Sequence, residues 1–243
     1  MSQVLKEEKY PDGSPKARET LLEDGKTTIK EGWYPNGQQE YKYNFVNGKE
    51  HGLREEWYQD GQPWHKMNYV NGKEHGLHEG WYQSGQQMYK WNFVNGQKHG
   101  LQEFWYRNGQ HQYKENFVNG QQHGVQEHWY QPSEVDPIIR QRGGQREYKL
   151  NFVNGKPHGV QEFWYKNGQQ SSKENFVNGK QHGVQEVWDK NGQQKDNKYY
   201  LDGTEFSQWV YQSYIRGLAP EVRAAADFGE RGLSGIIADY LLP

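Results

Sequence analysis

Apolar and polar residues alternate along most of this chain in short runs that recur every 24 residues. The clearest copy reads Leu-Gln-Glu-Phe-Trp-Tyr over residues 101–106 and Tyr-Lys-Glu-Asn-Phe-Val over residues 113–118, with an Asn-Gly pair soon after each run. Alternation between tight Asn-Gly signals is typical of β-hairpins with type I′ turns, in which both central residues have positive φ. The pattern therefore predicts two antiparallel strands of about eight residues in every repeat.

A His-Gly pair marks each repeat, and its successive spacings are 24, 24, 24, 35 and 24 residues. One repeat thus carries 11 additional residues, at 132–142. Repetition at such a period is typical of solenoids, in which each unit contacts mainly its neighbours. We expect a mostly β fold, an elongated single-layer antiparallel β-meander solenoid of about seven hairpin repeats over residues 1–201. The marker histidines are His51, His75, His99, His123, His158 and His182.

The register follows from the turns, because opposed residues in a two-residue hairpin have numbers with the same sum as the two turn residues. The first turn places Glu103 opposite Lys114, and the second places Asn116 opposite His123. We expect a structural ladder of Glu–Lys salt bridges and of His side chains bonded to the opposed Asn. Its members are Glu55, Lys66, Glu79, Lys90, Glu103, Lys114, Asn116, His123 and Trp105.

Alternation also assigns the two faces of the sheet. The ladder residues share one face with Leu101 and Val118, hardly vary between repeats, and are expected to be packed or internally hydrogen-bonded. A freely varying position lies on the other face, is expected to sit opposite the glycine of the His-Gly pair, and is our candidate for partner binding. This position is occupied by Tyr43, Met67, Trp91, Glu115, Leu150 and Glu174.

Two further segments are candidates for contact. The insertion at 132–142 is either a surface loop or a partner-binding finger carrying Ile138 and Ile139. From residue 202 to 243 the pattern predicts a helical C-terminal cap, with a first helix from Thr204 or Ser207 to Arg216 and a second from residue 220 to 226. The cap either covers the last sheet edge or docks a partner or a second copy. The stripe predicted on its first helix is Phe206, Val210 and Tyr214.

Composition narrows the function classes. The chain has 10 Trp, 18 Tyr and 9 Phe, and these numbers favour an aromatic sheet over a disordered chain. Its net charge of -2 gives no bias toward nucleic acid, and the absence of cysteine excludes disulfides and thiolate chemistry. The first residues do not resemble a signal peptide, and no apolar run approaches the ~20 residues of a membrane helix. We expect an intracellular, cytoplasmic protein.

The repeated polar residues do not predict catalysis. Equivalent histidines lie two strands apart, ~9.5 Å, which is too far for neighbouring rings to share a metal ion. The Glu–Lys pairs recur in every repeat, whereas an active site is normally single. The lysines face glutamates, which disfavours a stacking surface for single-stranded nucleic acid. We expect no catalytic residue, no metal and no cofactor.

The unit Trp-Tyr-x-Asn-Gly-Gln followed by Val-Asn-Gly-Lys-x-His-Gly resembles the variant form of the MORN repeat, over roughly residues 10–200. The resemblance implies non-catalytic roles in protein assembly or membrane-proximal scaffolding. Similar arrays are found in bacterial antitoxin or immunity proteins and in MORN proteins of large DNA viruses. The Gln-rich units and the helical tail are more similar to the viral kind, which implies the host cytoplasm or the virion.

We therefore expect a non-enzymatic scaffold that binds a protein partner or its own copies. A toxin-neutralising immunity protein and a peripheral membrane scaffold are the alternatives. The predicted contact residues are Tyr43, Met67, Trp91, Leu150, Ile138 and Ile139, and then Phe206, Val210 and Tyr214.

Overall fold

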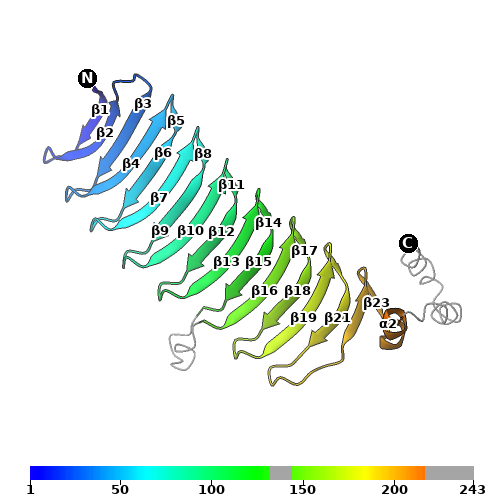
Figure 1. The fold of residues 1–243 in the computed structure, drawn as a ribbon. Helices are drawn as coiled ribbons and strands as arrows, with labels where there is room; N and C mark the ends of the chain where they lie inside the picture. Colours follow the sequence, from blue (N-terminus) through cyan, green and yellow to red (C-terminus); the bar gives the residue numbers. More distant parts are fainter. Residues whose placement is uncertain (132–143, 217–243) are drawn as a thin grey trace. The chain divides into compact units, whose positions relative to one another are not determined.

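The fold is known from a computed structural model that describes residues 1–131 and 144–216. The chain divides into two compact units, Met1–Gly155 and Lys156–Pro243. Both are built from antiparallel hairpins, as the alternation predicts (Figure 1). The insertion at 132–142, with Ile138 and Ile139, and the second predicted helix lie outside the described residues.

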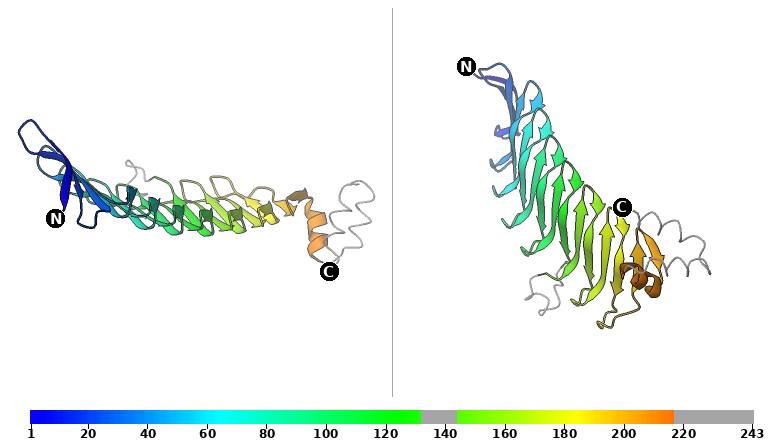
Figure 2. Two further views of the ribbon diagram at one scale, coloured as in Figure 1. Left: turned by 90° about the horizontal axis from the view of Figure 1, so that it is seen from above. Right: turned by 45° about the vertical axis from the view of Figure 1, so that its right-hand side comes forward.

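The unit Met1–Gly155 is a single-layered meander, whose long strands pair antiparallel with their neighbours in chain order (Figure 2). Four two-residue strands extend the hairpins at one edge. The predicted single-layer antiparallel meander is confirmed in this unit. Its strands are β1 Gln3–Lys9, β2 Pro15–Leu21, β3 Thr27–Trp33, β4 Gln39–Val46, β5 Lys49–Glu50, β6 Gly52–Trp57, β7 Pro63–Val70, β8 Lys73–Glu74, β9 Gly76–Trp81, β10 Gln87–Val94, β11 Gln97–Lys98, β12 Gly100–Trp105, β13 His111–Val118, β14 Gln121–Gln122, β15 Gly124–Trp129 and β16 Arg146–Val153.

The unit Lys156–Pro243 repeats this pattern and adds a short helix, α2. The Ser207 hydroxyl caps α2 by accepting a hydrogen bond from the backbone N of Val210 at 3.4 Å, so one of the two predicted caps is confirmed. Its elements are β17 Lys156–Pro157, β18 Gly159–Trp164, β19 Gln170–Val177, β20 Lys180–Gln181, β21 Gly183–Val187, β22 Lys198–Leu201, β23 Thr204–Phe206 and α2 Gln208–Ile215.

The predicted helix stripe needs one correction. Phe206 lies in β23, not on the helix, and is only 7% exposed. It is buried together with Tyr199 and Leu201, because α2 packs on β22 with the rings of Tyr199 and Tyr211 5.3 Å apart. Extended backbone thus continues to Phe206, past the predicted start of the cap at residue 202.

The two turns of each repeat differ in type. At Asn119-Gly120 both residues have positive φ, 50° and 77°, which is the expected type I′ hairpin. At Asn108-Gly109 only the glycine has positive φ, 84°. Gly109 N donates to the carbonyl of Tyr106, and Tyr106 N donates to the carbonyl of Gln110. This is a three-residue loop closed by a glycine bulge, so the type I′ prediction is wrong for the first turn.

A second irregularity restores the predicted register. Trp105 is opposite His111, whereas Phe104 is opposite Tyr113, so one residue, Gln112, is bulged. This bulge compensates for the longer turn. The opposition of Glu103 and Lys114 is therefore confirmed. The same opposition holds for Glu31 and Lys42, Glu55 and Lys66, Glu79 and Lys90, and Glu162 and Lys173.

The His-Gly pair forms a kink between the short and the long strand of each hairpin. In β13, Phe117 is opposite Gln122 of β14, but Lys114 is opposite Glu127 of β15, so two additional residues stand between the two pairings. The variable position therefore does not face the glycine of this pair, which is a correction. Instead it pairs with a polar residue of the preceding strand, as Glu115 does with Gln102.

Candidate binding faces of the sheet

One face of Met1–Gly155, called here the ladder face, carries an alternating line of charges. Acidic and basic residues are opposed from one long strand to the next. The Nζ of Lys114 lies 3.5 Å from Oε1 of Glu103, and the guanidinium of Arg18 lies 2.8 Å from Oε1 of Glu7. The line is Glu7, Arg18, Glu31, Lys42, Glu55, Lys66, Glu79, Lys90, Glu103, Lys114, Glu127 and Lys149.

The histidines of the ladder face do not use the partner that the sequence predicts. His123 meets Asn116 only through the backbone, its N donating to the Asn116 carbonyl at 2.9 Å. The Asn116 side chain donates instead to the carbonyl of Val125, and His123 Nδ1 accepts from the backbone N of Asn154 at 3.4 Å. The predicted His–Asn side-chain bond is therefore wrong, because the kink directs the imidazole to the next turn. His51, His75 and His99 likewise accept from the backbone N of Asn71, Asn95 and Asn119.

A second bond between repeats was missed by sequence reasoning. The Tyr106 hydroxyl donates to the carbonyl of Trp129, 23 residues ahead, at 2.9 Å. Its only sequence signal is the recurrence of Trp-Tyr at the repeat period. The same bond joins Tyr10 to Trp33, Tyr34 to Trp57, Tyr58 to Trp81 and Tyr82 to Trp105, at 2.7–2.9 Å.

The ladder face is internally paired but remains exposed. Its aliphatic side chains are accessible at similar levels in successive repeats, with Leu101 38% and Val118 41% exposed. Of the two expectations for this face, internal pairing is what the structure shows. Other exposed members are Val70, Leu77, Val94 and Val153.

The opposite face, called here the aromatic face, is the more buried of the two. Tyr89 and Phe93 are only 6% and 8% exposed. Tyr89 stacks on Trp91 with ring centroids 4.0 Å apart, and Phe93 packs against His78 at 4.8 Å. Offset contacts at these distances favour ordered rings. The rows of rings and the variable position thus share the face that sequence reasoning left open to solvent.

A row of buried polar side chains runs beneath these rings. Gln102 is 0% exposed and spans the kink: its Oε1 accepts from Asn92 N at 3.1 Å, and its Nε2 donates to Asn92 O at 2.8 Å. Gln126 holds Asn116 in the same way, with both distances 2.9 Å. The side-chain amide thus replaces the backbone hydrogen bonds between strands that the kink removes. Sequence reasoning missed this row.

His78 occupies the same row, with Nε2 2.8 Å from the Asn68 carbonyl and the residue 1% exposed. Burial lowers its pKa, so the neutral ring donates to this carbonyl. In the same row Arg54 pairs instead with Glu50 and Glu56, at 2.9 and 2.7 Å.

Four predicted contact residues lie in the described part of Met1–Gly155, and these four, Tyr43, Met67, Trp91 and Leu150, lie on the aromatic face and are half-buried. The Tyr43 hydroxyl donates to Oε1 of Glu56 at 2.7 Å, and the Arg54 guanidinium lies 4.2 Å above its ring. Burial, followed by the bond to Glu56, raises the pKa of Tyr43. Met67 is opposite Arg54, and Leu150 is opposite Gln126. Val210 and Tyr214 lie on α2 in the other unit.

Residues 1–131 and 144–216 contain no group of three or more His, Asp or Glu residues that could hold a metal ion. Within the same residues, no helix is long and apolar enough to cross a membrane. The repeated polar groups form pairs along the sheet, which is the chemistry of a stabilising ladder.

Comparison with known proteins agrees with this architecture. No curated protein matches the chain. Three stretches, residues 50–71, 98–119 and 157–178, match the MORN repeat variant. The match at 98–119 runs from Lys98 of β11 through β12 and β13 to Asn119 of the next Asn-Gly turn and so spans most of one repeat. MORN repeats are scaffolds rather than catalytic domains and are generally associated with binding to proteins or membranes. These three stretches are thus similar to the variant MORN repeat.

Proposed function

We propose that this protein is a non-enzymatic scaffold that binds a protein partner through the aromatic face of Met1–Gly155. The general association of MORN repeats with binding scaffolds supports the broader part of this proposal. The observation that carries the finer part is the variable position, which gives each repeat a different chemistry on a rigid sheet. Along the unit it reads Tyr43, Met67, Trp91, Glu115 and Leu150.

These side chains suit a protein interface. Aromatic residues and methionine are enriched in interface cores, and tryptophan and tyrosine are frequent hot spots. The Trp91 ring is already held, stacked on Tyr89 and with Lys98 Nζ 5.8 Å from its centroid. Side chains ordered before binding lose little rotamer entropy when a partner arrives.

The ladder face presents nearly the same side chains in every repeat and so gives a partner little to distinguish one repeat from the next. Each repeat presents a Glu–Lys pair, and these charges already satisfy one another, as Lys90 and Glu79 do at 3.5 Å. A partner on this face would meet the same groups every two strands. Nothing there would fix one position along the array over the next.

The experiment is affinity co-purification from the native source with two matched variants. Trp91→Ala truncates the aromatic face, and Leu101→Ser changes an exposed residue of the ladder face. We expect Trp91→Ala to weaken partner binding at least tenfold, as for a hot spot, and Leu101→Ser to leave it unchanged. Circular dichroism checks that both variants fold. Loss with Leu101→Ser and retention with Trp91→Ala would assign binding to the ladder face.

The recovered material distinguishes the finer proposals. One small stoichiometric partner supports a toxin-neutralising immunity protein, whereas several structural proteins or the chain's own copies support an assembly scaffold of the viral kind. Flotation with liposomes and no protein partner supports a peripheral membrane scaffold. A variant lacking residues 132–142 tests contact at Ile138 and Ile139, and Val210→Asp with Tyr214→Ala tests contact at α2.

A further inference from the structure

Two tyrosines of the aromatic face lie flat over a glycine of the preceding strand. A Cβ atom added to Gly80 would lie 2.2 Å from Cε1 of Tyr89, and one added to Gly32 would lie 2.1 Å from Cε1 of Tyr41. Real side chains do not approach so closely, so both rings require glycine beneath them. The two sites differ in the residue that is opposite the glycine on its other side, in the preceding strand.

At the first site, that of Gly80 and Tyr89, the tyrosine hydroxyl is hydrogen-bonded to a histidine. The row Glu56, His65, Gly80 and Tyr89 crosses four neighbouring strands, β6, β7, β9 and β10, each residue opposite the next. The Tyr89 hydroxyl lies 2.9 Å from His65 Nδ1, and the two rings are 5.6 Å apart and inclined by 27°. Burial lowers the pKa of His65, so its neutral ring accepts a hydrogen bond from the Tyr89 hydroxyl.

The second site repeats this row with one change. Glu8, Ala17, Gly32 and Tyr41 are opposed in the same order across β1, β2, β3 and β4. Each residue stands 48 positions, two repeats, before its counterpart in the first site. Three of the four residues are identical in the two rows, and only Ala17 differs, because it stands where the first site has His65. The second site therefore has the carboxylate, the glycine floor and the tyrosine, but no imidazole.

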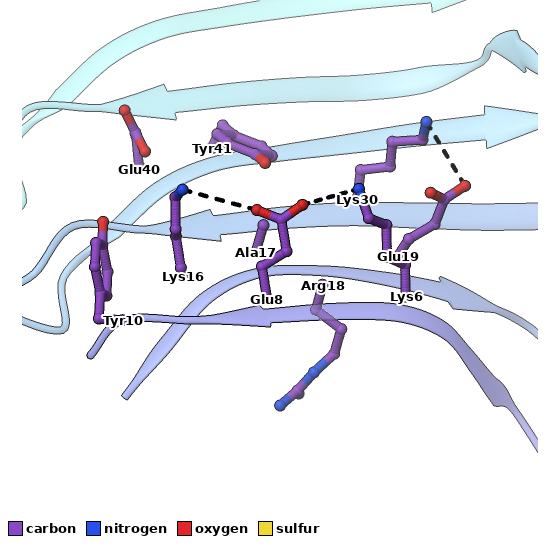
Figure 3. A pocket seen from close by; sticks show the side chains of 10 residues that line it. All are labelled: Lys6, Glu8, Tyr10, Lys16, Ala17, Arg18, Glu19, Lys30, Glu40 and Tyr41. Carbon is purple, nitrogen blue, oxygen red and sulfur yellow. Dashed lines mark ion pairs between the residues drawn. The ribbon is translucent and has the colours of Figure 1, made fainter. Parts of the chain in front are cut away.

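Beside Ala17, the counterpart of His65, lies a hollow of about 330 Å³ (Figure 3). Ala17, Tyr41, Glu8, Lys16 and Glu40 are among the residues that line it. Within the described part of the chain, the Tyr41 hydroxyl has no hydrogen-bond partner, whereas the Tyr89 hydroxyl has His65. Burial, followed by Glu40, raises the pKa of Tyr41, so the hydroxyl keeps its proton and can donate it.

The charges around the hollow are already paired with one another. Glu8 lies 2.8 Å from Lys6 Nζ and 3.8 Å from Lys16 Nζ, and Lys30 lies 3.6 Å from Glu19. A charged ligand would have to compete with these pairs. A neutral ring that brings one acceptor to the Tyr41 hydroxyl leaves them intact.

We propose that the hollow over Ala17 is a binding site for an imidazole-type ring. The ring lies beside Tyr41, as His65 lies beside Tyr89, and its unprotonated nitrogen accepts the hydrogen bond of the Tyr41 hydroxyl. The imidazole ring of His65 at the first site is therefore the model for the ligand at the second. At the first site Trp64 packs on His65 with centroids 4.4 Å apart, whereas its counterpart here is the exposed side chain of Lys16. The source of the ring is either a histidine of a protein partner or a free imidazole compound.

The direct test is a titration of the full chain with free imidazole at pH 8, where the ligand is neutral, followed through the ring resonances of Tyr41. Tyr41→Phe identifies those resonances by their loss. We expect a saturable shift with imidazole. Pyrrole, a ring of the same size without an acceptor nitrogen, should bind three- to tenfold more weakly because it cannot accept the hydroxyl proton.

Two reciprocal variants make the test specific. Ala17→His supplies the ring from the chain itself, so it should abolish the shift at Tyr41 and raise the thermal midpoint. His65→Ala opens the equivalent hollow beside Tyr89, so it should add a second site. Equal shifts in the wild type and in Ala17→His, or equal binding of imidazole and pyrrole, would overturn the proposal.

Co-purification with Ala17→His distinguishes the two sources of the ring. Loss of a partner, together with loss of imidazole binding, identifies a partner histidine. Retention of the partner with loss of imidazole binding identifies a small-molecule ligand. The titration uses no partner, so this site can fail while the protein-binding proposal stands, and the reverse also holds.

Discussion

Leu101 and Gln102 are adjacent in β12, yet the apolar side chain is 38% exposed and the polar one 0% exposed. The difference separates the two faces of Met1–Gly155. The ladder face satisfies its charges by pairs that lie near solvent, such as Glu103 with Lys114. The aromatic face buries its polar groups and closes each one with a specific partner, such as Asn92 for Gln102.

This contrast says where the stability of the unit lies. Ion pairs near solvent contribute little, typically 0–1 kcal/mol each, whereas a buried polar group that loses its partner costs about 1–3 kcal/mol. The face that repeats most faithfully is therefore the one whose single pairs contribute least. The face that varies contains the buried rings and the amide row that determine the stability.

The largest effect is expected at Gly80. Gly80→Ala places a Cβ atom 2.2 Å from the Tyr89 ring, which must then leave its stack on Trp91 and its bond to His65. Overpacking of this kind should lower the free energy of unfolding by about 3 kcal/mol. Urea unfolding measures it, with Leu77→Ala on the ladder face of the same strand as control, at about 1 kcal/mol. Equal losses would mean that the faces do not differ.

A smaller loss is expected at the amide row. Gln102→Leu keeps the size of the side chain but leaves the backbone N–H of Asn92 without its acceptor, whereas Asn92 O keeps the bond from His99 N. The free energy of unfolding should fall by about 2 kcal/mol. Amide hydrogen exchange at Asn92 should accelerate as well. An unchanged exchange rate would show that the side-chain amide is not the rung we assign.

His78 should contribute to the pH dependence of stability, as should His65, whose pKa is also lowered by burial. Because burial lowers the folded-state pKa of His78, the unfolded chain binds the proton first as the pH falls below about 6.5. Stability is thus fully present above pH 6.5 and declines toward the lowered pKa. His78→Gln, which introduces the amide found at Gln102 and Gln126, should reduce the loss of stability between pH 7 and 5. Urea unfolding at both values tests this, and an unchanged loss in the variant would contradict it.

The smallest effect is expected on the ladder face. Glu103→Gln removes the charge that pairs with Lys114 and that also faces His111 Nε2, 3.2 Å from Oε1. Because the Lys114 side chain is 35% exposed, the cost should be about 0.5 kcal/mol and should fall further in 1 M salt. A fall in the free energy of unfolding as large as that of Gln102→Leu would contradict the proposed difference between the two faces.

The sequence was sufficient to predict what depends on local signals. Asn-Gly pairs and alternation gave two hairpin turns per repeat, and the opposition of Glu103 and Lys114 followed from them. That opposition was right although the turn type was wrong, because the bulge at Gln112 offsets the longer loop. Bulges add residues to one strand without a fixed local signature, so arithmetic on turns does not detect them.

Burial was harder to predict because it depends on the kink at the His-Gly pair. This kink turns His123 toward Asn154 and places Gln102 under the rings. One signal was available: the position two residues after the glycine is always polar but never acidic, which is unusual in a half-buried strand. It is occupied by Arg54, His78, Gln102, Gln126, Gln161 and Gln185. The partner-binding roles of Tyr43, Met67, Trp91 and Leu150 stay predictions.

The tyrosine bond between repeats has a consequence for how such an array changes its length. Each internal repeat supplies one donor, such as the Tyr82 hydroxyl, and one acceptor, such as the Trp81 carbonyl that Tyr58 reaches. A duplicated repeat brings both halves of the joint with it, and a deleted repeat takes both away. The number of repeats can therefore change by whole repeats without redesign of any junction. The tyrosine hydrogen bond between repeats thus makes each repeat a self-contained module.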